Sequence, residues 1–285
     1  VLIFVFISYI IFGALVVREH DGGDYLPIIS PVSKIAHFIS LIPRNLNKIR
    51  NSEVNPRLSK ENRFNGQSGF SGNPNENETY LLISRYDGDL LDGVVELVNL
   101  ETFDIIHTWN PDLDIFWGKV NQNKGGEFEY LTRDKNDERS VLVHPLLTSN
   151  GSLISQNYSP LFKIDKESNL EWMIDDEIHH HSIEEDHEGN YWVAVDYYPF
   201  KIDKKFVGES VDNFLDDGIR KISSEGEILF DKSIPALFIE NGLEYILFAN
   251  GKHTWNEDPI HINDIELVSF DSKYWKKGDL FLSLR

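Results

Sequence analysis

The sequence predicts an all-β protein, and three observations support this prediction. From Thr79 onward, short runs rich in β-branched and aromatic residues alternate with clusters of Asp, Asn and Gly, which favour turns. No amphipathic pattern long enough for a helix of about ten residues interrupts these runs. A weak repeat also recurs, consisting of an apolar strand, a Gly-containing turn and an L/I-x-K-I element.

The repeat favours a β-propeller over other all-β folds. One copy covers Gly151–Asp175, a second covers Gly189–Asp231, and a third begins at Gly278. Four-stranded blades produce such repeats, with insertions that lengthen the interval. A β-sandwich ranks second, because its evenly spaced strands would not contain the recurrent element. We expect residues 79–285 to form a partial β-propeller domain of about three to four blades.

The first residues predict a membrane anchor. Residues 1–17 carry no charge and would span about 25 Å as a helix, so we expect a transmembrane helix there. A cleaved signal peptide is the alternative, but no small-x-small cleavage site precedes Arg18. Because Val1 is not Met and Arg285 ends a strand-like run, we expect the chain to be a fragment of a longer parent.

Residues 18–78 are expected to form a juxtamembrane helix followed by a polar linker. Within Pro31–Arg50, apolar residues recur at helical spacing. This helix would either lie flat on a membrane or pack on the main domain. Pro43 predicts a kink or a break in it.

Charge and cysteine content exclude several functions. The formal net charge is −20, from 47 acidic and 27 basic side chains, so the surface repels nucleic acid. The chain contains no cysteine, which excludes disulfides, thiolate metal sites and cysteine nucleophiles. An anionic ligand would therefore need cationic groups of its own at the binding site.

Three segments carry candidate chemistry: 177–193 with a run of three histidines, 258–265 with the motif H-x-N, and 278–285. The innermost strand of each propeller blade starts near the central axis. His180 or His181 is therefore expected to meet His261, with Arg285 close to both. Trp255 is a candidate to stack on an aromatic ligand.

Other interpretations of these residues remain open. The histidine triplet could be solvated or part of a metal site, although neighbouring residues of a strand point to opposite faces; we expect no bound metal. His107 and His144 are expected to be half-buried core or edge residues. The acidic runs 175–177, 184–188 and 212–217 are expected to be solvated loops.

The motifs resemble those of the arylsulfotransferase family. His180-His181-Ser182-Ile183 followed by Gly189-Asn190 is similar to the HHxI and GN elements of that family. The run of His261-Ile262-Asn263, Gly278-Asp279 and Ser283-Leu284-Arg285 is similar to its H-x-N, GD and S-x-R elements. The resemblance covers roughly residues 79–285, and its second part is the more specific one.

The resemblance implies a six-bladed propeller that acts outside the cytoplasm, in the periplasm of a Gram-negative cell. It implies transfer of a sulfuryl group from a phenolic sulfate ester to a phenol, through histidine chemistry and without a cofactor. The implied roles are catalytic for His180, His181, His261 and Arg285, and substrate-binding for Asn263 and Trp255.

Two departures from the family pattern limit this implication. The sulfohistidine of the family lies beyond the S-x-R strand, so we expect it beyond Arg285 and expect the fragment to be inactive alone. Ser182 stands where the family commonly has an acidic residue, which leaves open which histidine is functional. The alternative function is a non-catalytic propeller that binds an anionic aromatic ligand or a protein partner.

Overall fold

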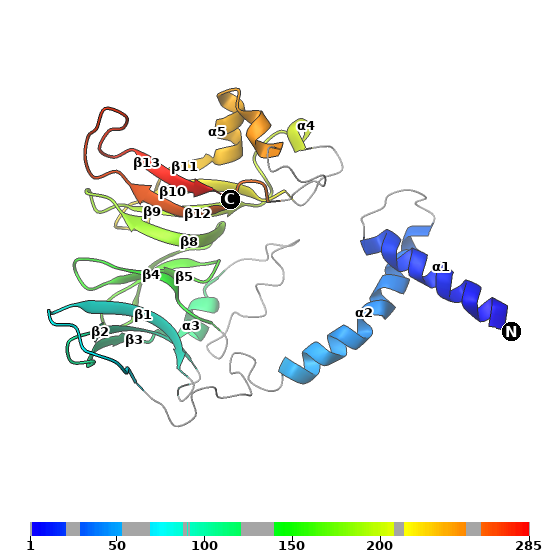
Figure 1. Ribbon diagram of the computed structural model, residues 1–285, viewed down its shortest axis with the longest axis horizontal. Helices are drawn as coiled ribbons and strands as arrows, with labels where there is room; N and C mark the ends of the chain where they lie inside the picture. The colour runs from blue at the N-terminus through cyan, green and yellow to red at the C-terminus, as the bar shows by residue number, and fades with distance from the viewer. Residues whose placement is uncertain are drawn as a thin grey trace. The chain divides into compact units, whose positions relative to one another are not determined.

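The computed structural model describes residues 2–20, 29–52, 69–87, 90, 92–120, 140–207, 214–248 and 258–284. The chain divides into two compact units, Val1–Asn62 and Arg63–Arg285. The ribbon diagram shows helices in the first unit and mainly strands in the second (Figure 1).

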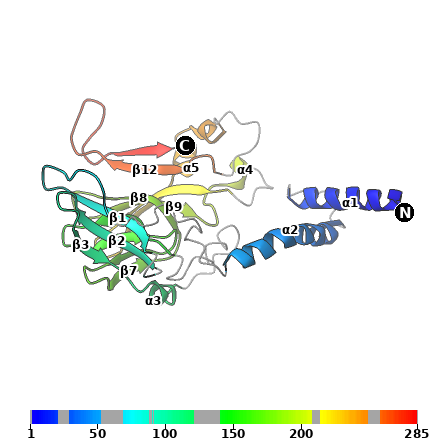
Figure 2. The same ribbon diagram turned by 60° about the horizontal axis from the view of Figure 1, so that its bottom comes forward.

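The first unit is a pair of helices, α1 (Leu2–His20) and α2 (Ser30–Ser52). They lie side by side (Figure 2). Apolar side chains from both helices line a hollow between them: Ile11, Phe12, Leu15, Val32, Ile35, Ala36 and Ile39. The buried Arg18 side chain donates a hydrogen bond from Nη1 to Ser33 Oγ at 2.7 Å, which ties the two helices together.

The helix expected over residues 1–17 forms and continues to His20. Within the described parts of the chain, no helix is both long enough and apolar enough to cross a membrane, so the transmembrane anchor is not confirmed. The break expected at Pro43 does not occur, because α2 continues through this residue to Ser52.

The second unit confirms the all-β prediction. Its described residues form four antiparallel sheets, in which strands that follow each other in the chain pair with each other. The first sheet contains β1 (Tyr80–Asp87), β2 (Asp92–Asn99) and β3 (Ile105–Trp109). The second contains β4 (Val143–Leu147), β5 (Leu153–Gln156), β6 (Leu161–Ile164) and β7 (Leu170–Ile174). The third contains β8 (Ile178–Glu185), β9 (Tyr191–Tyr197), β10 (Asp216–Ile222) and β11 (Ile228–Ser233). The fourth pairs β12 (Ile262–Leu267) with β13 (Leu280–Leu284).

Helices in this unit are short, as the absence of a long helical pattern predicts. They are α3 (Leu113–Trp117), α4 (Lys204–Val207), α5 (Ile234–Glu240) and the 3-10 helix η3 (Glu244–Phe248). Two of them have ordinary N-caps: Asp112 accepts from Ile115 N in α3, and Ser233 accepts from Ala236 N in α5.

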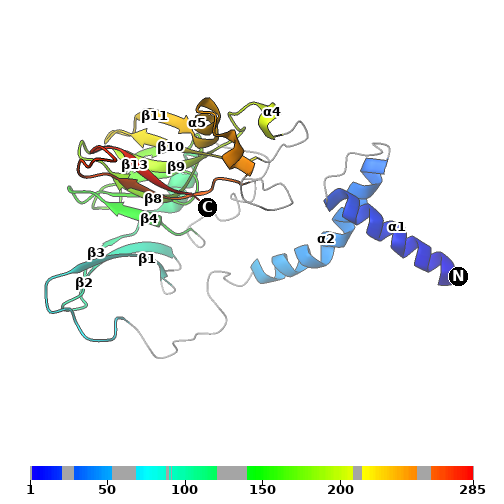
Figure 3. The ribbon, with the colours of Figure 1, turned by 45° about the horizontal axis from the view of Figure 1, so that its top comes forward.

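The first strands of the second, third and fourth sheets are neighbours. β8 lies between β4 and β12 and contacts both (Figures 1 and 3). Among the described residues the sheets do not close into a ring, so the six-bladed propeller stays a prediction.

The core lies between successive sheets. Leu153 and Ile154 are consecutive residues of β5, and both are fully buried. Leu153 packs toward Trp109 and Phe162, whereas Ile154 belongs to the cluster around Val193 in the third sheet. Because both faces of these strands are covered, they appear in the sequence as continuous apolar runs rather than as alternating ones.

Candidate active site

Three histidines from three different sheets come together. His181 Nε2 of β8 lies 3.1 Å from Nε2 of His261, which directly precedes β12 and is 80 residues away in the chain. The ring of His144 in β4 lies 5.9 Å from the ring of His181, measured between centroids. The expected meeting of the histidine run with His261 is therefore what the structure shows, and His144 joins it from a third sheet.

The same backbone feature presents each of these three side chains. His144, His181 and His261 have φ values of 45°, 56° and 36°. Such left-handed conformations are uncommon outside glycine and are found at functional sites more often than elsewhere. The pairing register is shifted next to each of them. A bulge of this kind redirects a side chain, so strict alternation along the strand does not hold here.

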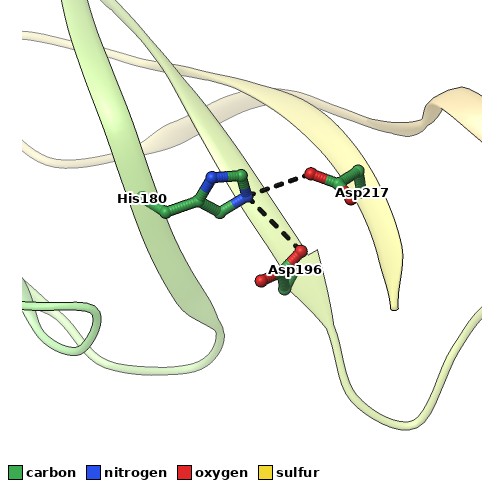
Figure 4. A group of neighbouring side chains, drawn as sticks. All are labelled: His180, Asp196 and Asp217. Atoms are coloured by element: carbon green, nitrogen blue, oxygen red, sulfur yellow. Dashed lines mark ion pairs between the residues drawn. The ribbon is translucent and has the colours of Figure 1, made fainter. Parts of the chain in front are cut away.

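His180 is bound between two carboxylates (Figure 4). Its Nε2 atom lies 3.1 Å from Asp217 Oδ1 and 3.4 Å from Asp196 Oδ1. Asp196 of β9 and Asp217 of β10 are direct cross-strand partners, and two like charges at such positions repel each other. A protonated imidazole between them offsets that repulsion.

The charge state of His180 follows from this arrangement. Burial alone would lower the pKa of its ring, because it disfavours the charged form. Hydrogen bonds and charges from Asp196 and Asp217 outweigh burial and raise the pKa to about 10. His180 is therefore a fixed buried cation at neutral pH.

His181 has the opposite electrostatic environment. Its pKa is lowered by burial and by the neighbouring rings of His180, His261 and His144, so it is neutral at pH 7. His261 Nδ1 lies 2.8 Å from Asp258 Oδ2, and this contact places the Nδ1 proton of His261 toward the carboxylate. Between the two facing Nε2 atoms, one ring must donate and the other must accept. The pair is therefore suited to taking up and releasing a proton.

Side-chain hydrogen bonds to the backbone hold the histidine strands in place. Asp217 Oδ1 accepts from Ile262 N at 3.1 Å, immediately after His261. Ser182 Oγ accepts from Ile265 N, also at 3.1 Å. Gln156, which is 1% exposed, donates from Nε2 to the carbonyl oxygen of His181 at 3.4 Å. These three contacts connect the second, third and fourth sheets around the imidazole pair.

The third member of the histidine run, His179, faces different partners. Arg220 Nη1 lies 3.3 Å from His179 Nε2, and its guanidinium also binds Asp176 and Asp231. An arginine nitrogen can only donate, so His179 accepts through Nε2 and is neutral. The three histidines thus have three separate roles, and His179 and His181 do not form a joint metal site.

Several predicted residues are placed differently from expectation. Asn263 is exposed at the register shift of β12, and its Nδ2 donates to the carbonyl oxygen of His261 at 3.2 Å. It therefore contacts the His261 backbone. Trp255 and Arg285 lie outside the described residues, so their roles stay predictions.

The acidic runs are not all solvated loops, which corrects the expectation. Asp216 and Asp217 are 0% and 1% exposed and belong to β10, whereas Glu184 and Glu185 belong to β8. Burial is tolerated because each Asp has partners: Asp216 accepts from Ser233 Oγ and from Lys201 N. Solvated loops are expected from sequence alone because aspartate is found mostly at protein surfaces.

Sequence reasoning missed four supporting residues of this site and did not place His144 beside the other histidines. Asp196, Asp217, Asp258 and Gln156 support the histidines, but only their pairing in three dimensions reveals it. A signal for His144 was present: like His181 and His261, it stands at the beginning of the first strand of a repeat. β4 is an edge strand of its sheet, so the edge alternative holds for His144, which lies exposed beside His181.

Among the described residues, one group has donor atoms close enough to hold a metal ion. The donor atoms of His180, Asp196 and Asp217 lie within 4.8 Å of one another. One imidazole and two carboxylates are ligands that zinc and related divalent ions accept. When no ion is bound, the proton on His180 supplies the positive charge between Asp196 and Asp217.

Fold and site together define an all-β protein in which imidazoles and supporting carboxylates meet at the first strands of neighbouring sheets. Such a class of site suits general acid–base proton transfer. A family model described as arylsulfotransferase (ASST) matches residues 151–285, which are 135 of the 285 residues. This part of the chain is therefore similar to the arylsulfotransferase family. The match begins in the turn before β5 and includes His181 and His261, but not His144. No curated protein matches the sequence.

Proposed function

We propose that the protein transfers a sulfuryl group from an aryl sulfate ester to a phenol, with His181 and His261 at the reacting centre. The observation that carries this proposal is the facing pair of Nε2 atoms at 3.1 Å, supported on one side by the Asp258 carboxylate. The arylsulfotransferase match over both histidines supports the same reaction class.

The proposed chemistry uses the imidazole pair as a proton carrier. The bond between sulfur and the phenolic oxygen of the donor breaks, with its electron pair going to that oxygen, and a new bond forms between sulfur and the hydroxyl oxygen of the acceptor phenol. A protonated ring of the pair gives its proton to the departing phenolate, and the pair regains a proton from the hydroxyl of the acceptor phenol. Asp258 stabilises the charged form of His261 during this cycle.

The transferred group also needs positive charge, since the protein is strongly acidic overall. His180 is protonated, and its ring centroid lies 5.1 Å from that of His181 and 6.0 Å from that of His261. Asp196 and Asp217 already balance its charge, so the transferred group needs a further cation. A buried cation near developing negative charge is most effective where water is scarce. In this proposal Arg285 would add a second cation, and Asn263 and Trp255 would complete the binding of the substrate.

Release of 4-nitrophenol from 4-nitrophenyl sulfate, dependent on an added phenol, tests the function. The His261→Ala variant is expected to lose at least about 100-fold in kcat/KM, because loss of general acid–base catalysis typically costs that much. His187→Ala is the matched control, since His187 is an exposed histidine in a turn of the same protein. Equal rates for His261→Ala and the wild type would exclude His261 from the reaction.

Binding of 4-nitrophenyl sulfate without any phenol-dependent release would instead support the non-catalytic function.

We also propose that the four sheets are blades of a propeller, which the adjacency of β4, β8 and β12 supports. The exposed apolar side chains of α1 support a further proposal, that the first unit holds the protein at a membrane. A site outside the cytoplasm is part of this proposal through the family resemblance alone.

A further inference from the structure

We propose that His144 is a third imidazole of the site and binds the anionic group of the substrate from the solvent side. This inference rests on the proposed function, because it assigns the sulfate ester as the ligand. It concerns a residue that lies outside the segment matched by the arylsulfotransferase model.

The first argument is the repeated backbone geometry. His144 stands on the first strand of its sheet, next to a register shift, with φ of 45°. His181 on β8 and His261, directly before β12, likewise have a positive φ close to a register shift at the first strand of the following sheets. An unfavourable backbone conformation persists only where surrounding structure imposes it. Three such conformations, each carrying an imidazole toward one place, define one shared site.

The second argument is how the strand around His144 is anchored. The carbonyl oxygen of the preceding residue, Val143, accepts a hydrogen bond from Ser155 Oγ at 3.0 Å, and Ser155 is fully buried. The next residue of β5, Gln156, pairs with Val143 and donates to the carbonyl oxygen of His181. The backbones of His144 and His181 are thus fixed to the same short segment.

The third argument is the gradient of exposure through the cluster. His180 is 6% exposed, His181 and His261 are partly buried, and His144 is exposed. An anion that enters this cluster from solvent therefore meets His144 first. Sulfate carries several acceptor oxygens, so an imidazole N–H on the open side can bind one of them while the inner pair contacts others.

A pair of amide substitutions tests this role by changing only the reach of the side chain. His144→Asn places a short amide at the position, and Asn tolerates a positive φ. His144→Gln carries the same amide further out. Equilibrium binding of inorganic sulfate and of 4-nitrophenyl sulfate is measured by calorimetry on the full chain, with His187→Ala as the control.

His144→Asn is expected to weaken the binding of both anions about tenfold, which is the loss expected for a hydrogen bond to a charged group. His144→Gln is expected to recover part of this loss, and His187→Ala to bind as the wild type does. In the wild type, the ring nitrogen resonances of His144 are expected to shift when sulfate saturates the site, as seen by NMR of protein with labelled histidine. This last readout stands even if a substitution prevents folding.

Unchanged affinity in His144→Asn, or ring nitrogens of His144 that do not respond to sulfate, would overturn the inference. Failure of the wild type to bind either anion would overturn it as well. The two proposals remain distinguishable because binding needs no turnover. Transfer activity with an unchanged KM in His144→Asn would leave the function standing without this role for His144. Weakened anion binding in His144→Asn, with no transfer activity in the wild type, would support the anion-binding role of His144 and contradict the proposed transfer function.

Discussion

At the residue scale, three consecutive histidines on β8 have three different electrostatic environments. His179 accepts from Arg220, His180 lies between two aspartates, and His181 faces His261. The register shift after His180 makes this possible, because it lets neighbouring side chains reach the same region. A run of identical residues therefore supplies a neutral acceptor, a cation and a proton carrier.

The Asp217 carboxylate gives a test of the His180 cation. Asp217→Asn keeps an oxygen that can accept from Ile262 N, but it removes the charge beside His180. We expect it to destabilise the protein by about 3 kcal/mol near neutral pH, as loss of one partner of a buried ion pair does. Chemical denaturation measures this difference, and the exposed Glu167→Gln variant is the control.

The pH dependence of this difference has a defined sign. The pKa of His180 is about 10 in the folded protein, above its ordinary value of 6.5. A raised pKa contributes stability that is complete below pH 6.5 and is lost as the pH rises through about 10. The difference in stability between wild type and Asp217→Asn should therefore be largest just below pH 6.5 and should narrow as the pH rises toward 10. A gap that widens with rising pH would contradict the assignment of His180 as a cation.

At the element scale, β10 packs so tightly between its neighbours that one position admits only glycine. A Cβ atom at Gly218 would lie 2.3 Å from Tyr197 Cε2 and 2.7 Å from the carbonyl oxygen of Lys232. Tyr197 is held in turn by a hydrogen bond to Asp231 and is 1% exposed. The strand that carries Asp217 is therefore fixed in position directly beside that residue.

Gly218→Ala is expected to destabilise the protein by about 1–3 kcal/mol, because the added methyl group must displace a packed ring or backbone. Gly118→Ala is the matched control. A Cβ atom there meets nothing closer than 3.5 Å, and φ is −62°, so stability should stay within about 0.5 kcal/mol. Thermal unfolding of both variants checks the prediction, and equal melting temperatures would show that β10 can yield at Gly218.

The strands could be predicted because turn residues recur where strands end. Asp186 N donates to Asn190 O in the β8–β9 turn, and Ser223 N donates to Glu227 O in the β10–β11 turn. Gly189 and Gly226 supply the positive φ that both turns need. These local signals stand in the sequence itself, so the all-β prediction and the repeat were accessible from it.

The supporting residues of the site could not be predicted, for a different physical reason. Asp196 and Asp217 are placed by cross-strand pairing, and nothing in their local sequence separates them from solvated acids. The orientation of His144 depends on a bulge, and no residue type specifies a bulge reliably. The meeting of His181 and His261 could be predicted because the sequence contains repeats, and both histidines stand near equivalent strand starts in them.

At the scale of the whole molecule, the first unit differs from the second in where its apolar side chains lie. On α1 the exposed fractions of Ile3, Phe4, Phe6 and Tyr9 are 77%, 75%, 66% and 78%. At about 100° per residue these positions point in different directions around the helix rather than along one face. A protein partner would cover one face, whereas lipid can surround a helix that is apolar on all sides.

The proposal that this unit holds the protein at a membrane predicts a change in fractionation. Phe4→Glu together with Ile7→Glu places charges on α1, and these should move the protein from the membrane fraction to the soluble one, because charge is costly within lipid. Tyr274→Glu is the control, since Tyr274 is an exposed aromatic residue of the second unit. A wild-type protein found wholly in the soluble fraction would contradict the proposal.

The 80-residue separation of His181 and His261 also determines when the histidine site can form during folding. Each sheet pairs strands that follow each other in the chain, so forming its hydrogen bonds closes only short loops. The contact between the two imidazoles closes a much longer loop, which is slower to form. The imidazoles can therefore face each other only after β12 has docked on β8. An anion that binds both rings then connects the third and fourth sheets. A change that weakens the packing of β12 on β8 should therefore also weaken anion binding, and bound anion should stabilise that packing.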